Sequence, residues 1–140
     1  MATNSIIIKF PGDRQIRFSL YLDAAPVTCE AFCKALPFQL KLLHAKVSGQ
    51  ELWSPNGPSL DIIQENATVF LDAGEIAIGP LKPARNKLPR SIGIFYGDGK
   101  LVDCANVFAK VYEEDMVALK NIGEQVWLES APVVTFEVYV

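Results

Sequence analysis

An alternation of apolar and polar side chains with a period of two constrains the fold of this chain more than any other feature. Residues 16, 18, 20 and 22 are apolar and are separated by less apolar residues, and related patterns occur at residues 6–10 and 134–140. Successive side chains of a strand point to opposite faces, so these segments predict antiparallel strands with one covered face. A Pro-Gly turn at residues 11–14 joins the first two strands.

Two other segments have helical spacing. Between residues 26 and 37, apolar side chains recur at i, i+3, i+4 and i+7, and they are Cys29, Phe32, Cys33 and Leu36. Acidic residues 113–115 favour the start of a second helix, and Gly123 predicts a left-handed C-cap, so this helix is expected to end before Gln125.

The remaining segments predict short strands, a hairpin at residues 69–78 and an exposed, mobile loop at residues 80–90, which is rich in proline and basic residues. About eight short strands with only two short helices indicate a mostly β fold, a closed or nearly closed antiparallel β-barrel whose helices cover its ends. A β-sandwich is the alternative. No composition shift divides the chain, so residues 1–140 are expected to form a single domain.

Charge and hydropathy exclude several classes of partner. The chain has 13 Lys and Arg residues against 16 Asp and Glu residues, which argues against nucleic acid because phosphate binding needs a basic face. No apolar run is long enough for a membrane span and residues 1–5 do not resemble a signal peptide, so we expect no membrane association and a cytoplasmic location. The three cysteines fit neither a disulfide framework nor a metal motif.

The order of the expected elements is similar to that of the cyclophilins. The segment Ala25-Pro26-Val27-Thr28 resembles the start of their first helix, and residues 108–111 resemble the strand that leads into their second. A closer resemblance is to a family of small bacterial cyclophilin-like proteins of unassigned function. The residues that carry it are His44, Ser48, Gly49, Gln50, Glu51, Glu65, Asn66, Ala67, Thr68, Tyr96, Gly97, Asn106, Val107 and Phe108. This resemblance implies a cyclophilin-like barrel with a pocket, but no particular reaction.

The chain departs from true cyclophilins where their catalytic motifs would stand. Those enzymes use an arginine in a Phe-His-Arg stretch and a downstream Gln-Gly-Gly-Asp segment. Here residues 42–46 read Leu-Leu-His-Ala-Lys, and Gln-Gly-Gly-Asp does not occur. A catalytic guanidinium would have to come from Arg85 or Arg90, so peptidyl-prolyl cis-trans isomerase activity is only the third hypothesis.

His44 and two glutamates are the candidate catalytic residues. His44 is the only histidine, and its parity with Leu40 and Leu42 predicts an inward side chain that exchanges protons near neutral pH. Glu65, and secondarily Glu51, are candidates for a carboxylate that orients the imidazole or acts as a general acid or base. The alternatives are a histidine hydrogen-bonded inside the barrel and glutamates on the surface.

Five further residues are candidates for substrate binding. Asn66, Asn106 and Tyr96 carry donors for a carbonyl or an oxyanion, although Asn66 also suits a turn. Trp53, with Tyr96, suits an aromatic wall for a planar ligand, and core packing is the alternative for both. Arg90 is a candidate clamp for a carboxylate, or else part of a solvated loop.

Together these residues predict a protein that binds a small polar metabolite. In the leading hypothesis it uses a His/Glu site for proton transfer on an amide or a carboxylic acid, and in the second it is a non-catalytic subunit that binds a ligand or a partner. Neither hypothesis implies a cofactor or a metal. Pairing of exposed strand edges makes a homodimer plausible, but no segment of the sequence specifies its interface.

Overall fold

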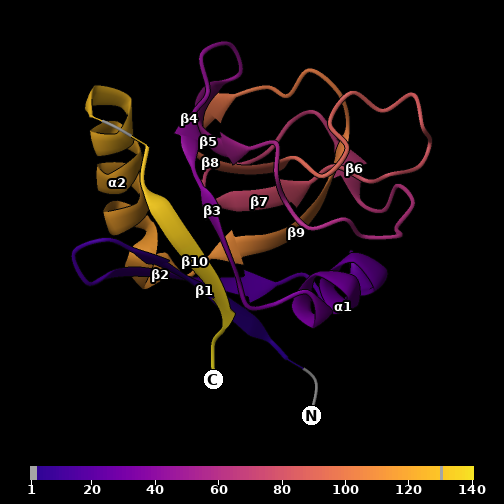
Figure 1. Ribbon diagram of the computed structural model, residues 1–140, viewed down its shortest axis with the longest axis horizontal. Helices are drawn as coiled ribbons and strands as arrows, with labels where there is room; N and C mark the ends of the chain where they lie inside the picture. The colour runs from indigo at the N-terminus through magenta and orange to yellow at the C-terminus, as the bar shows by residue number, and fades with distance from the viewer. Residues whose placement is uncertain (1–2, 130) are drawn as a thin grey trace.

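The computed structural model describes residues 3–129 and 131–140, so three residues of the expected domain 1–140 lie outside the described part (Figure 1). The strands of the described part are β1 (Ser5–Phe10), β2 (Arg14–Leu20), β3 (Phe38–Lys41), β4 (Leu43–His44), β5 (Gly49–Ser54), β6 (Ala67–Thr68), β7 (Glu75–Ile78), β8 (Ile92–Gly99), β9 (Ala105–Val111) and β10 (Val133–Val138). The helices are α1 (Pro26–Lys34) and α2 (Met116–Leu128), the latter preceded by the 3-10 turn η1 (Glu113–Asp115).

One interrupted strand joins the two ends of the sheet. The strands follow the order β3-β10-β1-β2-β9-β7-β8-β5-β4, and β6 pairs with β9. The terminal strands β3 and β4 are consecutive in sequence and are separated by Leu42, whose N–H donates to Pro132 O at 3.0 Å. The first half of the segment therefore pairs with β10 and the second half with β5, so the antiparallel sheet forms a nearly closed barrel. This confirms the predicted fold class.

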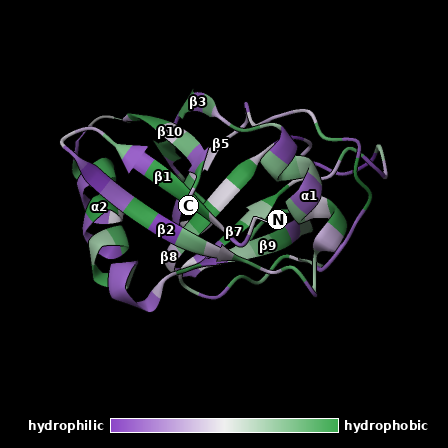
Figure 2. Ribbon diagram, turned by 90° about the horizontal axis from the view of Figure 1, so that it is seen from below, coloured by the Kyte–Doolittle hydropathy of each residue, from purple (hydrophilic) through white to green (hydrophobic). Residues whose placement is uncertain are grey.

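Figure 2 shows hydrophilic and hydrophobic residues alternating along β2, and the apolar residues of β1 and β2 fill the interior of the barrel. Ile6, Ile8, Ile16 and Phe18 are fully buried there. Helix α1 covers this core with Phe32, whose ring lies 4.5 Å from that of Phe108. Helix α2 contributes a buried stripe that consists of Leu119, Ile122, Gly123 and Val126, and its apolar residues belong to the same core. Burial of these apolar surfaces is the main favourable contribution to folding.

A smaller apolar cluster covers the outer face of β7, β8 and β9. It contains Leu71, Ala77, Phe95, Leu101, Ala105 and Val107. The connecting loops supply Leu71 and Leu101, so this part of the sheet is buried on both faces. For that reason residues 92–96 form a continuous buried run instead of an alternating one.

The prediction that Gly123 ends the second helix is wrong. Helix α2 continues to Leu128, and Gly123 is a buried residue in its interior. A Cβ at this position would overlap with the ring of Tyr96 on β8. Glycine is present here because it lets the helix approach an aromatic ring closely, a reason that only the packed structure makes visible.

The predicted hairpin at residues 69–78 is also wrong. Of its two expected strands only β7 forms, and β7 pairs with β8 and β9 instead of with residues 69–71. The loop at residues 80–90 contains neither helix nor strand, as expected, but it is not exposed throughout. Asn86 is buried and donates to Cys104 O at 2.7 Å, which fixes this loop to the segment before β9.

Candidate functional site

A cavity of about 630 Å³ lies against the outer face of the sheet, where β5, β7, β8 and β9 face the connecting loops. The sheet contributes Ala77, Gly93 and Ala105, whose small side chains leave this space open. Leu88 and Leu101 line the cavity from two loops. The cavity has the size typical of sites for small molecules and a mainly apolar lining.

Hydrogen bonds hold the two loops that line the cavity to each other. The carboxylate of Asp103 accepts from Lys87 N at 2.9 Å and from Cys104 N at 2.8 Å. These two backbone bonds lower the pKa of the Asp103 carboxyl below its usual value. The wall of the cavity is therefore built from fixed loops, although the segment at residues 80–90 has no regular secondary structure.

The register of the strands places His44 and Glu51 on opposite faces of the sheet. His44 pairs with Leu52, which in turn pairs with Ile94, and these side chains share the inner face. Trp53 pairs with Gly93, and Glu51, two residues before Trp53, shares their outer face. Glu51 and Trp53 thus line the cavity from the sheet, whereas His44 borders it beside α2. The predicted inward register of His44 is confirmed.

Both ring nitrogens of His44 have partners within the protein. Nδ1 lies 2.7 Å from Ala45 O, and Nε2 lies 2.6 Å from the hydroxyl of Tyr96. A carbonyl oxygen only accepts, so we assign the proton to Nδ1 and Tyr96 as the donor to Nε2. The ring also packs edge-on against Trp127, with centroids 4.8 Å apart. His44 therefore joins β4 to β8 and α2, and it has no free nitrogen for a ligand.

Glu51 is the buried carboxyl group of the cavity. Glu51 is 4% exposed, and burial raises the pKa of its carboxyl to about 7. A hydrogen bond that Ser48 Oγ donates to Oε1 acts in the opposite direction and lowers this pKa. A Cβ at Gly93 would overlap with Oε2, so the missing side chain leaves room for the carboxyl in its present position. Among the described residues, no hydrogen bond reaches Oε2.

Glu65 lies at the N-terminus of α1 and does not line the cavity. Its Oε1 accepts from Thr28 N at 2.8 Å and from Thr28 Oγ1 at 2.7 Å, and Oε2 accepts from Val27 N at 3.3 Å. Residue Ala25 at the N-cap provides no side-chain acceptor, so Glu65 satisfies the first N–H groups of the helix from a distant loop. The structure therefore does not place Glu65 beside His44.

Asn106 is fully buried and connects Glu65 to the barrel. Its Nδ2 donates to Thr28 Oγ1 at 3.1 Å and to Ile63 O at 2.9 Å, while its Oδ1 accepts from Glu65 N at 3.1 Å. These three hydrogen bonds satisfy both Nδ2 donors and the Oδ1 acceptor of the amide with partners inside the protein. The polar residue within an apolar strand thus fixes the loop that caps α1.

Asn66 and Arg90 both adopt left-handed backbone conformations outside the cavity. Asn66 has a φ of 48° and donates from Nδ2 to Val107 O at 2.9 Å, as a turn residue does. Arg90 has a φ of 65°, and its Nε donates to Gly57 O at 3.0 Å. Their side chains hold adjacent loops to the barrel.

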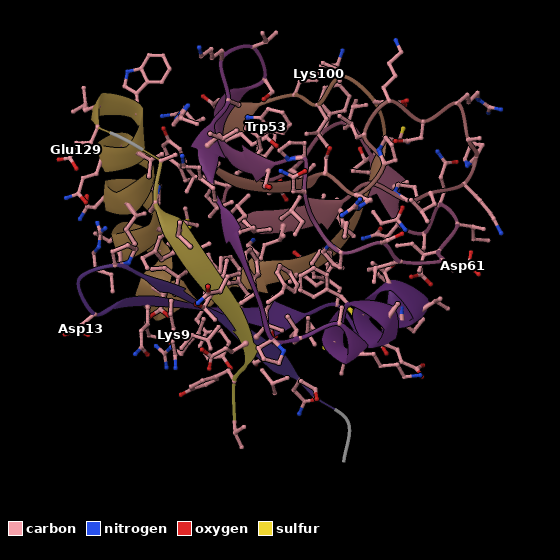
Figure 3. All side chains as sticks on the ribbon, viewed as in Figure 1. Lys9, Asp13, Trp53, Asp61, Lys100 and Glu129 are labelled. Carbon is pink, nitrogen blue, oxygen red and sulfur yellow. The ribbon has the colours of Figure 1, made fainter. Side chains whose placement is uncertain are left out.

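Of the eight predicted site residues, the cavity thus brings together three, which are His44, Glu51 and Trp53. Tyr96 contacts the site through His44. Sequence reasoning did not single out Gly93 or Trp127 as site residues. The position of Gly93 inside an apolar strand could have identified it, because a glycine there often marks a point where another group approaches the backbone closely. Figure 3 labels Trp53 on β5 in the upper part of the view, with Glu129 to its left beside the end of α2.

In residues 3–129 and 131–140, no group of three or more His, Cys, Asp or Glu side chains is arranged to hold a metal ion. Over the same residues, no helix combines the length and the apolar character that crossing a membrane requires.

Solved structures place the barrel in the cyclophilin-like class of folds. The chain is similar to a cyclophilin-type peptidyl-prolyl cis-trans isomerase from Cryptosporidium parvum, with a TM-score of 0.64 and 13% identity over 99% of each chain. A hypothetical protein from Archaeoglobus fulgidus has a TM-score of 0.65 and 18% identity, with 98% of this chain and 95% of that chain covered. The sequence belongs to the family described as "Protein of unknown function (DUF3830)", whose model matches residues 11–138.

A third similar structure is that of McbB in complex with tryptophan, with a TM-score of 0.73 and 18% identity. The match covers 95% of this chain and 44% of McbB, so the chain spans less than half of that protein. At these identities the three structures establish the fold alone. A search among curated proteins finds no match.

Proposed function

We propose that this protein binds a small molecule with an apolar body in the outer-face cavity, and that Glu51 exchanges a proton with the polar group of that ligand. The observation that carries the proposal is a cavity of about 630 Å³ in which a buried carboxyl group lies among mainly apolar side chains. Such a combination of an apolar pocket and a perturbed titratable group is typical of ligand sites.

Proton exchange is assigned to Glu51 in place of the His44 and Glu65 pair. Hydrogen bonds within the protein occupy both nitrogens of His44 and both carboxylate oxygens of Glu65. Within the described residues, one oxygen of Glu51 has no such partner, and its pKa of about 7 suits a general acid or base at neutral pH. If no bond of the ligand is formed or broken, the same site belongs to a binding protein without catalytic activity.

The similarity to McbB supports the proposal, since the structure of that protein is a complex with tryptophan. Prolyl isomerisation is less well supported. No arginine of the described residues lines the cavity, and the side chain of Arg90 donates to a backbone carbonyl elsewhere. Pairing of two copies into a homodimer stays a prediction.

Binding of the neutral probe 1-naphthylmethanol tests the proposed function. At a concentration ten times its Kd, a ligand that binds only the folded state adds roughly 1.4 kcal/mol to the free energy of unfolding. We expect the probe to raise the Tm of the wild type and to raise that of Trp53→Ala less, because Trp53 lines the cavity.

Val133→Ala is the control, because Val133 is 55% exposed on β10 and lies outside the cavity. Its response to the probe should equal that of the wild type. A millimolar probe concentration that leaves the Tm unchanged and shifts no amide resonance of cavity residues would contradict the proposed function.

A further inference from the structure

We propose that the ligand of this cavity carries a protonated nitrogen, an ammonium or amidinium group on an apolar body, and that this cation pairs with Glu51. The inference rests on the proposed function and names the chemical class of its ligand. The surroundings of the Glu51 carboxyl group determine which ligand group stabilises it.

Glu51 has no counter-ion within the described part of the protein. No nitrogen of a lysine, arginine or histidine there lies within 4.0 Å of its carboxylate oxygens, whereas five other ion pairs are formed. Ser48 donates to Oε1 alone. A buried carboxylate without a counter-ion is costly, so a cation that enters the cavity gains an interaction that the protein itself does not supply.

The neighbours of Glu51 suit a cation on an apolar body. Trp53 is two residues further along β5 on the same face, and the corresponding Cα atoms of a strand are separated by roughly 7 Å. A cation at Glu51 therefore has an indole ring within reach of its apolar part. Leu88, Leu101 and Ala105 line the space around it.

The other charged groups of the cavity lie at its borders. Lys46 is exposed on the connection between β4 and β5, Glu129 is exposed after α2, and the side chain of His44 lies on the inner face of the sheet. Glu129 adds a second negative charge near the opening, and Lys46 adds a positive one. Glu51 is the buried one of these four residues, and its carboxyl, once ionised, sets the preference of the site.

Pairing with a cation requires the ionised form of Glu51. Because burial raises the pKa of this carboxyl to about 7, a cationic ligand releases a proton when it binds near neutral pH. Its affinity then rises with pH. From the ionised fraction of such a group, we expect binding to tighten about tenfold between pH 6 and pH 8.

Three probes with one ring system test the inference by isothermal titration calorimetry: 1-naphthylmethylamine, 1-naphthylmethanol and 1-naphthylacetate. At pH 8 we expect the amine to bind about tenfold more tightly than the alcohol and the acetate to bind most weakly. Glu51→Gln should remove the advantage of the amine and its dependence on pH. Glu113→Gln, at an exposed residue outside the cavity, is the matched control and should retain both.

The outcomes separate this inference from the proposed function. Binding of the alcohol with no preference for the amine, a preference for the acetate, or an amine preference that survives in Glu51→Gln would overturn the inference while the cavity remains a binding site. Failure of all three probes to bind would refute the proposed function, and the inference with it.

Discussion

The raised pKa of Glu51 predicts how the stability of the protein depends on pH. The folded state holds the proton of this carboxyl up to a pH of about 7, whereas an ordinary glutamate loses it near 4.5. The folded state therefore binds more protons between these values, and its stability falls as the pH rises. The shift of this pKa from 4.5 to about 7 contributes roughly 3 kcal/mol to the free energy of unfolding at low pH. About 2 to 3 kcal/mol of this contribution should be lost between pH 5 and pH 8.

Urea denaturation of the wild type and of Glu51→Gln at pH 5, 6, 7 and 8 measures this contribution. The difference between the two proteins isolates Glu51, because every other titrating group is common to both. The pKa values of Asp103 and Asp115 are lowered, so these carboxyl groups change the free energy of unfolding only below about pH 4, outside the range of this experiment. Parallel pH profiles of the wild type and the variant would refute the assignment of a buried, protonated Glu51.

Three further substitutions test the packing and the hydrogen bonds. Gly123→Ala should lower the free energy of unfolding by about 1 to 3 kcal/mol because its Cβ overlaps with Tyr96, even though alanine favours an isolated helix by about 1 kcal/mol relative to glycine. Val117→Ala, at an exposed position of the same helix, is the control, and a Gly123→Ala variant more stable than the wild type would contradict the described packing. Asn106→Ala should cost about 3 kcal/mol in urea denaturation because it removes the three hydrogen bonds of a fully buried amide. Glu65→Ala should cost about 1 to 2 kcal/mol by exposing the N-terminus of α1, and it should leave the affinity for 1-naphthylmethanol unchanged; loss of that binding in the folded variant would place Glu65 in the cavity after all.

The fold could be predicted because local patterns determine it. Period-two alternation marks the strands at both ends of the chain, and one apolar stripe marks α1. The errors occur where distant contacts override a local signal. Glycine is typical of a helix C-cap, but Gly123 lies inside α2 because its close contact with Tyr96 on β8 leaves no room for a side chain. Residues 69–71 suit a strand, but β8 and β9 occupy both edges of β7.

The site could be predicted only in part, because single residues do not reveal their partners. The sequence identifies His44, Glu51 and Glu65 as groups capable of proton transfer, and it orients His44 inward. It does not show that Glu65 lies at a helix N-terminus or that His44 is bound by Tyr96. Nor does it show that Gly93 makes room for Glu51, because the bulge between Gly49 and Glu51 sets that register.

The position of β10 between β1 and β3 has a consequence for the synthesis of the chain. The register joins Ile6 to Val138 and Phe38 to Phe136, so two early segments are neighbours of residues that a ribosome adds more than ninety positions later. A hairpin of β1 and β2 has one edge exposed throughout that time. Nascent chains of this protein should therefore depend on protection of that edge until translation is almost finished.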